Sequence, residues 1–396
     1  MVRLAIVSSH PIQYNAPLFR LLSQRKDLNV KVFYSWKGTA NQNDPEFGEK
    51  IVWDIPLLKG YDYCFVENVA KDPGTHHFTG LNNPNMVQEI ERWGADTLLI
   101  YGWAFRTHLT VLRHFHKRIP IFFRGDSTLL TGGKPFRQLF RRLCLTWVYK
   151  YVDVAFYPGT NSKEYFLAYG LSERQLVHVP HAIDNNRFSN NEDSLEKKAL
   201  DHRNALGIPD ESLVLLFAGK FVPRKQPVML LNAICELNAS GKFPPIHLIY
   251  VGTGPLFEKL HKAAKSLEFI HILGFKNQSE MPIVYRMGDL YVLPSNIETW
   301  GLGVNESMAS YRPVIVSDKV GCSIDLVKAE ISGEIFSADD IFDLKKTILK
   351  CVKNKKQIFD MRQSARKLIE NWSIEKASNL MGDYILAHVA KGCSCK

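Results

Sequence analysis

Two glutamates stand eight residues apart in segment 295–318, on either side of a Gly-x-Gly sequence. Glu298 comes before the glycines and Glu306 comes after them. An ionised carboxylate only accepts hydrogen bonds, so a pair of carboxylates suits the hydroxyl groups of a sugar and a ribose. Either glutamate alone is equally well explained as a solvated surface charge. The surrounding sequence therefore decides whether the two form a site.

The glycines lie where a strand gives way to a helix. The run LYVLPS predicts a strand, NIETWG a loop, and LGVNESMAS a helix that begins near Leu302. The first amides of a helix have no partner within it and lie at the positive end of its dipole, so they favour a phosphate. Gly301 and Gly303 keep side chains away from these amides. The junction predicts a phosphate site between the glutamates.

Positive charge follows another predicted strand. Gly219 ends an apolar run, and Lys220, Arg224 and Lys225 come within the next six residues. Ammonium and guanidinium groups at a strand-to-helix junction are suited to a diphosphate. The alternative is an ordinary basic surface loop.

Runs of β-branched and aromatic residues alternate with amphipathic segments along the whole chain. This alternation is typical of βαβ units and a parallel sheet, and therefore of an α/β fold. The predicted strands are 3–9, 30–36, 96–102, 120–126, 152–158, 175–180, 213–220, 246–252, 270–275, 289–295, 313–318 and 332–337. The predicted helices of the first half are 16–25, 84–94, 106–117, 136–150 and 161–169.

A polar, charged segment divides this alternation into two halves. Residues 186–211 are almost free of β-branched residues and predict a linker or an exposed helix. A chain of 396 residues is also long for a single core. We therefore expect an N-terminal domain over 1–185, a C-terminal domain over 212–372, and a last helix and tail over 373–396 that pack back toward the N-terminal domain.

Polar residues and glycines gather after the predicted strands. Ligands of open parallel sheets bind beyond the carboxyl ends of the strands, so these residues are expected to face one cleft between two domains. They are His10, Arg124–Asp126, Gly219–Lys225, Gly252–Gly254, Phe275 and Ser295–Glu298.

The composition is that of a globular protein with anionic partners. Hydrophobic residues make up 45% of the chain, and fifty Lys and Arg against forty Asp and Glu leave a net charge of +10. The seven cysteines include no C-x-x-C pair, which favours reduced thiols over a disulfide framework or a zinc site. No apolar run approaches the length of a membrane span. We expect a cytoplasmic protein, in solution or peripheral on the cytoplasmic face of the membrane.

Five separated motifs resemble the retaining, nucleotide-sugar-dependent glycosyltransferases of family 4. Their order and spacing are those of the family, and the resemblance is strong over about 150–330 and diffuse before it. It implies the GT-B fold, in which two Rossmann-like βα domains face each other across a cleft. The motifs are VPHAIDNNRF, FAGKFVPRKQP, YVGTGPLFEKL, ILGF and PSNIETWGLGVNESMAS.

The resemblance implies a role for each residue of the C-terminal site. Lys225, with Lys220 where the family usually has Arg, binds the donor diphosphate and stabilises it as it leaves. Glu306 holds the ribose hydroxyls, and Glu298 contacts the donor sugar. Gly252, Gly254 and the backbone of Phe275 line the base pocket. The implied donor-binding set is Gly219, Lys220, Arg224, Lys225, Gly252, Gly254, Phe275, Glu298, Gly301, Leu302, Gly303 and Glu306.

The resemblance also implies transfer with retention of configuration and without a metal or other cofactor, and the chain has no Asp-x-Asp sequence. The N-terminal domain of the family binds the acceptor. On that side the candidates are His10, Gln13, Arg124 and Asp126, although a lone histidine can equally have a structural role. The residues expected to be catalytic are Glu298, Lys225, Lys220, His10 and Asp126.

Three positions depart from the family pattern. Lys220 stands where the family usually has an Arg. An Arg guanidinium can bind two oxygens at once, whereas the Lys ammonium is a single point charge. Tyr311 stands where a glycine commonly ends the helix, so the helix end is expected to differ. The loop after the first strand lacks the glycine pair that many members have there.

Segment 134–152 alternates basic with large apolar residues. One interpretation is a core-facing helix with a solvated basic face, and the other is a helix that lies on an anionic bilayer. The basic residues are Lys134, Arg137, Arg141, Arg142 and Lys150, and the apolar ones are Phe136, Leu139, Phe140, Leu143, Trp147 and Tyr149.

The sequence thus favours a glycosyltransferase that moves a sugar from a nucleotide-sugar donor to a saccharide or lipid-linked acceptor, in cell-surface polysaccharide or glycolipid assembly. A GT-B-fold nucleotide-sugar epimerase and a non-catalytic assembly subunit stay open as alternatives. Nucleic-acid binding is disfavoured, because the basic residues form none of the known reading motifs.

Overall fold

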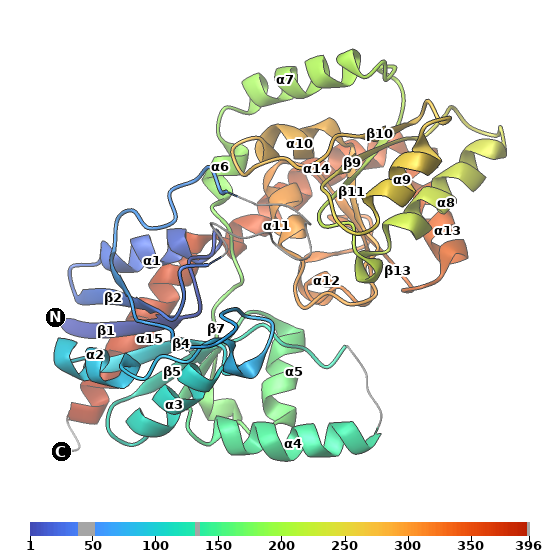
Figure 1. Ribbon diagram of the computed structural model, residues 1–396. Helices are drawn as coiled ribbons and strands as arrows, with labels where there is room; N and C mark the ends of the chain where they lie inside the picture. The colour runs from blue at the N-terminus through green and yellow to red at the C-terminus, as the bar shows by residue number, and fades with distance from the viewer. Residues whose placement is uncertain (39–51, 131–134, 394–396) are drawn as a thin grey trace. The chain divides into compact units, whose positions relative to one another are not determined.

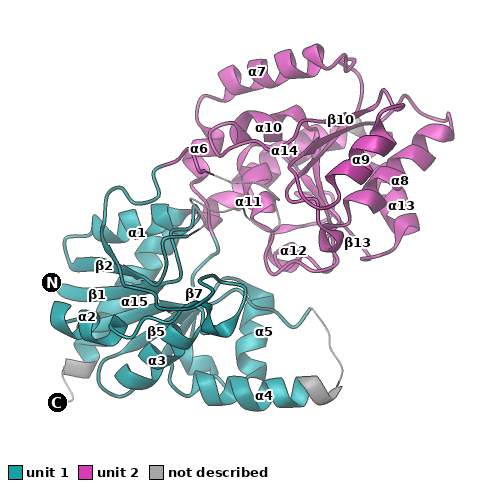
Figure 2. Cartoon of the chain, in the orientation of Figure 1, with its two compact units in different colours: residues 1–41, 56–181, 374–396 teal, residues 42–55, 182–373 magenta. Residues whose placement is uncertain are grey.

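The computed structural model describes residues 1–38, 52–130 and 135–393. The chain divides into two compact units, shown in Figure 2. Unit 1 comprises residues 1–41, 56–181 and 374–396, and unit 2 comprises residues 42–55 and 182–373. No helix among the described residues combines the length and apolar character needed to cross a bilayer.

Unit 1 is built on a seven-stranded parallel sheet with the order β3-β2-β1-β4-β5-β6-β7 (Figure 1). Its strands are β1 Val2–Ser8, β2 Leu28–Tyr34, β3 Asp62–Phe65, β4 Thr97–Tyr101, β5 Ile121–Arg124, β6 Val154–Tyr157 and β7 Leu176–His178. Its helices are α1 Ala16–Ser23, α2 Met86–Trp93, α3 Arg106–Phe115, α4 Pro135–Tyr149, α5 Thr160–Ala168 and α15 Ile374–Cys393.

Alternating side chains of β5 show how both faces of this sheet are covered. Phe122 lies under α15, with its ring 6.4 Å from that of Tyr384. The next residue, Phe123, points to the opposite face, where its ring lies 5.6 Å from that of Tyr149 in α4. Successive residues of a strand point to opposite faces, so a strand covered on both sides must be apolar throughout. This explains why the central strands read as continuous apolar runs.

Unit 2 is built on a six-stranded parallel sheet with the order β10-β9-β8-β11-β12-β13. Its strands are β8 Val214–Ala218, β9 His247–Val251, β10 Ile270–Ile272, β11 Leu290–Leu293, β12 Val314–Ser317 and β13 Gly333–Phe336. Its helices are α6 Asn185–Ser189, α7 Glu192–Ala205, α8 Pro227–Ala239, α9 Phe257–Ala264, α10 Met281–Met287, α11 Leu302–Ala309, α12 Ser323–Leu326, α13 Ile341–Lys353 and α14 Lys355–Ile369.

The described elements match the predicted α/β alternation, with two differences. Strand β3 was not predicted, because its residues are exposed or half-buried and form no apolar run. The polar segment 186–211 is part of unit 2 and forms α6 and the largely exposed α7, which agrees with the exposed-helix alternative and not with a separate linker. Helix α15 belongs to unit 1, where Arg25 of the N-terminal chain donates to Asp383 at 2.7 Å.

Candidate functional site

The candidate site of unit 2 lies where the strand order reverses. Strand β8 pairs with β9 on one side and with β11 on the other. After β8 the next strands are added on one side of the sheet, and after β11 they are added on the other side. Such a switch point leaves space beyond the carboxyl ends of the two strands, which is where ligands of this type of sheet bind. The basic loop 219–226 follows β8, and the loop 294–301 follows β11.

An ion pair joins these two loops. The Lys225 ammonium donates to Oε2 of Glu298 at 2.8 Å, and the two side chains are 17% and 18% exposed. Lys225 ends the 3-10 turn that starts at Pro223, and Gln226 follows in the left-handed region with a φ of 52°. This sharp turn brings the ammonium back toward the sheet. The structure thus places together a lysine and a glutamate that were predicted to act on one donor.

Backbone and side-chain hydrogen bonds brace the two loops behind the ion pair. The amide of Asn296 donates to the carbonyl of Arg224 at 2.9 Å. Oδ1 of Asp339 accepts from the side-chain amides of Gln226 at 2.8 Å and of Asn296 at 2.9 Å. Asp339 therefore fixes both loops at once. Lys220 is half-buried in the same loop as Arg224.

Helix α11 begins at Leu302, close to the predicted start, after Gly301 with a φ of 98°. Packing requires the second glycine, because a Cβ at Gly303 would lie 2.5 Å from the hydroxyl of Tyr291 and 3.2 Å from that of Tyr285. Both glycines therefore also have a structural reason, because Gly301 takes a backbone conformation that favours glycine and Gly303 lies against two tyrosines. That they leave room for a ligand stays a prediction.

Glu306 is a buried carboxylate and not a surface charge. It lies on α11 and is 3% exposed. Its Oε2 accepts from the Tyr285 hydroxyl of α10 at 2.7 Å, and its Oε1 lies 3.9 Å from Nη2 of Arg187 in α6. Arg187 also donates to Oε1 of Gln278 at 2.6 Å. Because a buried charge must be compensated, this carboxylate is held in place by two other helices.

The loops after β9 and β10 continue this edge of the sheet. Gly219 donates its amide to Val251 at 2.9 Å, and Gly252 donates to Gly274 at 2.7 Å. Gly254 follows in the same loop and is half-buried. These contacts place the predicted base-pocket glycines beside the loop that carries Lys220 and Lys225.

A short segment from the N-terminal half of the chain lies against the loop that carries Phe275. The ring of Trp53 lies 6.3 Å from that of Phe275. Asp54 accepts from the amide of Ser279 at 3.2 Å and from its hydroxyl, and Asn277 donates to Val52 at 2.7 Å. No sequence pattern predicts this contact, because it joins residues more than two hundred positions apart.

The helix end at Tyr311 also differs from the expectation. We expected a different cap, because a tyrosine replaces the usual glycine. The backbone nevertheless takes the left-handed conformation of a glycine cap, with a φ of 60°. The amide of Tyr311 donates to Met308, and that of Arg312 donates to Ser307, which is the Schellman pattern. The ring of Tyr311 packs under the guanidinium of Arg286, 6.0 Å away.

The predicted acceptor residues lie in unit 1. His10 follows β1 and is half-buried, with its Nδ1 3.0 Å from Oγ of Ser9 and its ring 5.7 Å from that of Trp36. Gln13 is half-buried in the same loop, and Asp126 is exposed beyond β5. Their roles toward an acceptor stay predictions.

Arg124 has a structural task that the sequence did not reveal. It is 7% exposed, and its guanidinium donates to the carbonyls of Val179 at 2.8 Å and Pro180 at 3.0 Å. Burial lowers the pKa of Arg124. The side chain ties β5 to the segment after β7, so its guanidinium is committed to the backbone of unit 1.

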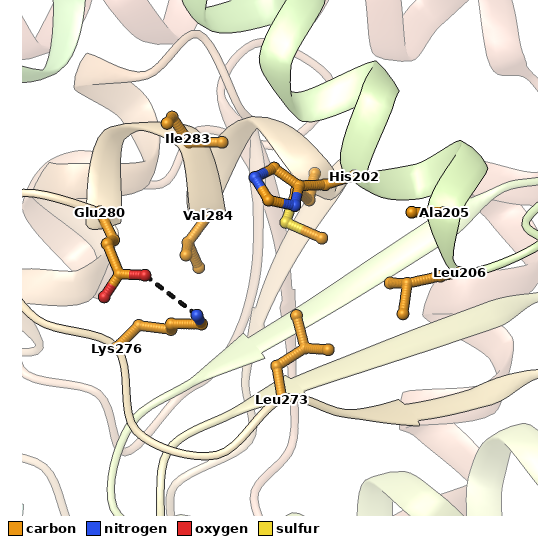
Figure 3. A pocket seen from close by; sticks show the side chains of 9 residues that line it. His202, Ala205, Leu206, Leu273, Lys276, Glu280, Ile283 and Val284 are labelled. Carbon is orange, nitrogen blue, oxygen red and sulfur yellow. Dashed lines mark hydrogen bonds and ion pairs between the residues drawn. The ribbon is translucent and has the colours of Figure 1, made fainter.

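A cavity of about 200 Å³ in unit 2 lies apart from these residues (Figure 3). It opens between α7, α10 and the segment after β10, and Lys276 pairs with Glu280 at 2.9 Å on its wall. None of the residues predicted to bind the donor lines it. The lining residues are His202, Ala205, Leu206, Leu273, Lys276, Glu280, Ile283, Val284 and Met287.

Comparison with known proteins finds similar glycosyltransferases. Residues 199–368 match the family model of glycosyl transferases group 1. A glycosyltransferase of Methanocaldococcus jannaschii is 28% identical over 163 residues, which are 41% of this chain and 44% of that protein. The match thus spans less than half of the relative's length.

Two solved structures share the fold over nearly the whole chain. A sucrose-phosphate synthase from Thermosynechococcus elongatus has a TM-score of 0.74 and 17% identity, covering 99% of this chain and 100% of its own. HepE of Anabaena in complex with UDP has a TM-score of 0.74 and 16% identity, covering 98% of this chain and 100% of its own. The two Rossmann-like units therefore have the GT-B fold.

Proposed function

We propose that this chain is a retaining glycosyltransferase. It moves a sugar from a nucleotide-diphosphate-sugar donor to a saccharide or lipid-linked acceptor, in the assembly of cell-surface polysaccharide or glycolipid. The observation that carries the proposal is the ion pair of Lys225 with Glu298 at the switch point of unit 2, beside the start of α11. The match of residues 199–368 and the UDP held by HepE support it.

Lys225 is suited to serve the carboxylate and a diphosphate at once. An ammonium has three N–H donors, and the hydrogen bond to Glu298 uses one of them. The other two can turn to phosphate oxygens, while Lys220 and the first amides of α11 supply further positive charge. A preorganised charge of this kind stabilises the diphosphate most strongly when it leaves, because its negative charge is then greatest.

The two carboxylates take opposite ends of the donor in this proposal. Lys225 donates to Oε2 of Glu298, and the other carboxylate oxygen of Glu298 can accept a hydrogen bond from a hydroxyl of the donor sugar. Glu306 accepts one hydrogen bond from Tyr285, and an ionised carboxylate offers about four acceptor positions, so ribose hydroxyls can add to that bond. Burial makes those bonds stronger than bonds at the surface.

Transfer breaks the bond between the anomeric carbon and a phosphate oxygen, and the electron pair leaves with the diphosphate. The acceptor hydroxyl bonds to that carbon from the same face, and its proton passes to the departing phosphate oxygen. In the proposed site Lys220 and Lys225 stabilise the growing negative charge, and Glu298 orients the sugar. His10 and Asp126 would contact the acceptor or the donor sugar. No metal is required by this scheme.

Nucleotide binding gives the first test. The melting temperature is measured with UDP, GDP, ADP and dTDP for the wild type, for Lys225→Ala and for Lys242→Ala, an exposed lysine of the same unit. At about 100 times the dissociation constant, one nucleoside diphosphate should raise the melting temperature by roughly 5 to 10 °C. Only Lys225→Ala should lose that rise. If none of the four nucleotides stabilises the wild type, the proposal fails.

Product analysis separates the enzymatic alternatives. The protein is incubated with nucleotide sugars in the absence of an acceptor, and the products are separated by chromatography. A transferase should release the nucleoside diphosphate slowly by hydrolysis, whereas an epimerase would form a new sugar nucleotide. Binding of the nucleotide without consumption of any donor, alone or with saccharide acceptors, would instead favour a non-catalytic assembly subunit.

A further inference from the structure

Helix α4 has two apolar faces, and only one of them is buried. Leu145, Val148 and Tyr149 pack into unit 1. At 100° per residue, Leu139 and Leu143 lie on the opposite side of the helix, away from this buried face. The described residues of segment 134–152 therefore show the core-facing side and the exposed basic residues of the first interpretation, and also an exposed apolar side that this interpretation does not explain.

Four large apolar side chains form the outward face. Leu139 is 59% exposed, Phe140 66%, Leu143 66% and Trp147 40%. They fall within about 100° of the helix circumference, so they form one continuous stripe. Single exposed apolar residues are common, but a contiguous group of this size marks an interaction surface. We name these four residues the apolar stripe.

Positive charge surrounds the apolar stripe. Arg142 on α4 and Arg113 on α3 are exposed, and the guanidinium of Arg113 lies over the ring of Trp147 at 5.8 Å. The ammonium of Lys150 lies 5.6 Å from the same ring. No acidic residue occurs anywhere between positions 127 and 152. The surface therefore combines exposed apolar side chains with three neighbouring positive charges, those of Arg113, Arg142 and Lys150.

Arg141 differs from the other basic residues of the helix. Its guanidinium lies 5.5 Å from the ring of Tyr165 and 5.7 Å from that of Tyr169, and it donates to the Tyr165 hydroxyl at 3.4 Å. It therefore fastens α4 to the rest of unit 1 and is not part of the outward face. Lys134 and the side chains of Phe136 and Arg137 lie outside the described residues.

We propose that the outward face of α4 binds an anionic lipid bilayer. The apolar stripe enters the boundary between headgroups and acyl chains, as the apolar side of an interfacial helix does. Trp147 lies at the headgroup level, where aromatic side chains are enriched. Arg113, Arg142 and Lys150 attract the lipid phosphates. Charge complementarity selects this partner, because a cationic rim attracts anionic headgroups and repels a second copy of itself.

Vesicle co-sedimentation tests the proposal and needs no sugar donor, so its outcome is independent of the proposed activity. The full chain is mixed with vesicles of phosphatidylcholine alone and with vesicles that also contain about one-third phosphatidylglycerol. The wild type should bind the anionic vesicles and release them as salt is raised. A triple variant, Leu139→Gln/Phe140→Gln/Leu143→Gln, changes only exposed side chains of the stripe and should lose most of this binding.

Two further variants show which property of the face matters. Arg142→Ala/Lys150→Ala should weaken binding to anionic vesicles roughly 30-fold, because each basic residue contributes a factor of about 5 at a charged surface. Phe342→Gln/Phe359→Gln is the matched control, because it removes two exposed phenylalanines, 74% and 65% exposed, from unit 2. This control should bind like the wild type.

Three outcomes would overturn the proposal. The triple variant could bind as the wild type does, or the wild type could bind both kinds of vesicle equally. The wild type could also fail to bind vesicles and form a dimer in light scattering that the triple variant abolishes. In that case a second copy of the chain covers the apolar stripe.

Discussion

The ammonium of Lys225 lies 2.8 Å from a carboxylate oxygen of Glu298, although 73 residues separate them in the chain. Neither group is fully solvated, so each sets the position of the other. An anionic ligand that reaches this pair finds the positive charge already in place beside the start of α11. The two residues thus form one functional unit, and a substitution of either one should change the position of the other side chain.

Lys225→Ala is expected to lower kcat about 100-fold, which is typical for loss of one preorganised charge or donor in a transition state. Donor turnover, followed by release of nucleoside diphosphate, gives the measurement. Lys242→Ala, at an exposed position of the same unit, should turn over normally. Near-normal turnover by Lys225→Ala would show that its ammonium does not act on the leaving group.

Glu306→Gln is expected to separate recognition of the ribose from recognition of the phosphates. The amide keeps the size of the side chain but removes the charge, and hydrogen bonds to charged groups are the stronger ones. Calorimetry should show roughly a 10-fold loss of affinity for the nucleoside diphosphate and no change for inorganic pyrophosphate. Glu258→Gln, at an exposed position of α9, serves as the control. Equal losses for both ligands would contradict the assigned role.

Gly303→Ala is expected to destabilise unit 2 by about 1–3 kcal/mol, because the added methyl group would lie 2.5 Å from the Tyr291 hydroxyl. Urea unfolding measures this loss. Adding Tyr291→Phe removes the hydroxyl oxygen and should restore part of the stability. A double variant no more stable than Gly303→Ala would mean that the clash lies elsewhere.

Acidification is expected to destabilise the fold between about pH 6.5 and pH 4. Burial lowers the pKa of His108 to about 4 and that of His271 to about 4 in the folded protein. An unfolded histidine titrates near 6.5, so between pH 6.5 and pH 4 the unfolded state binds more protons than the folded state. The free energy of unfolding therefore decreases as the pH is lowered through this window. Stability should be regained above pH 6.5.

His271→Gln isolates part of this effect. Nε2 of His271 lies 3.1 Å from Nδ1 of His247 on the neighbouring strand, and both histidines have a lowered pKa. Urea unfolding of this variant at a series of pH values should give a shallower dependence than the wild type. The exposed His261 offers the matched control, His261→Gln. An unchanged slope in His271→Gln would remove this histidine from the explanation.

The sequence predicted the buried strands well because burial on both faces leaves a direct pattern. Phe122 and Phe123 face opposite helices, so every residue of β5 from Ile121 to Arg124 had to be compatible with a buried position. Strand β3 left no such pattern, because it lies at the sheet edge and is half-exposed. Prediction failed where hydrogen bonding, and not burial, forms the strand.

The candidate site was predictable in its charged residues and not in their supports. The sequence indicated Glu298, Glu306 and Lys225 because carboxylates and ammonium groups follow the carboxyl ends of predicted strands, where ligands bind. It gave no sign that Asp339 would brace the loops or that Tyr285 would bind Glu306. Those contacts depend on how distant segments fold together. Tyr311 is a further example, because its residue type predicts a helix end without a left-handed residue, whereas its backbone has a φ of 60°.

The placement of α15 has a consequence for the order in which the protein is made. The ring of Tyr384 covers Phe122 of a sheet whose strands all precede position 179, and Arg25 reaches forward to Asp383. A ribosome therefore finishes every strand of both sheets before it supplies this cover. Unit 2 can fold while the chain is still growing, whereas the part of the unit 1 sheet around Phe122 stays uncovered until α15 is made. Chaperones that bind nascent apolar surface would therefore be needed longest by the earlier half of the chain.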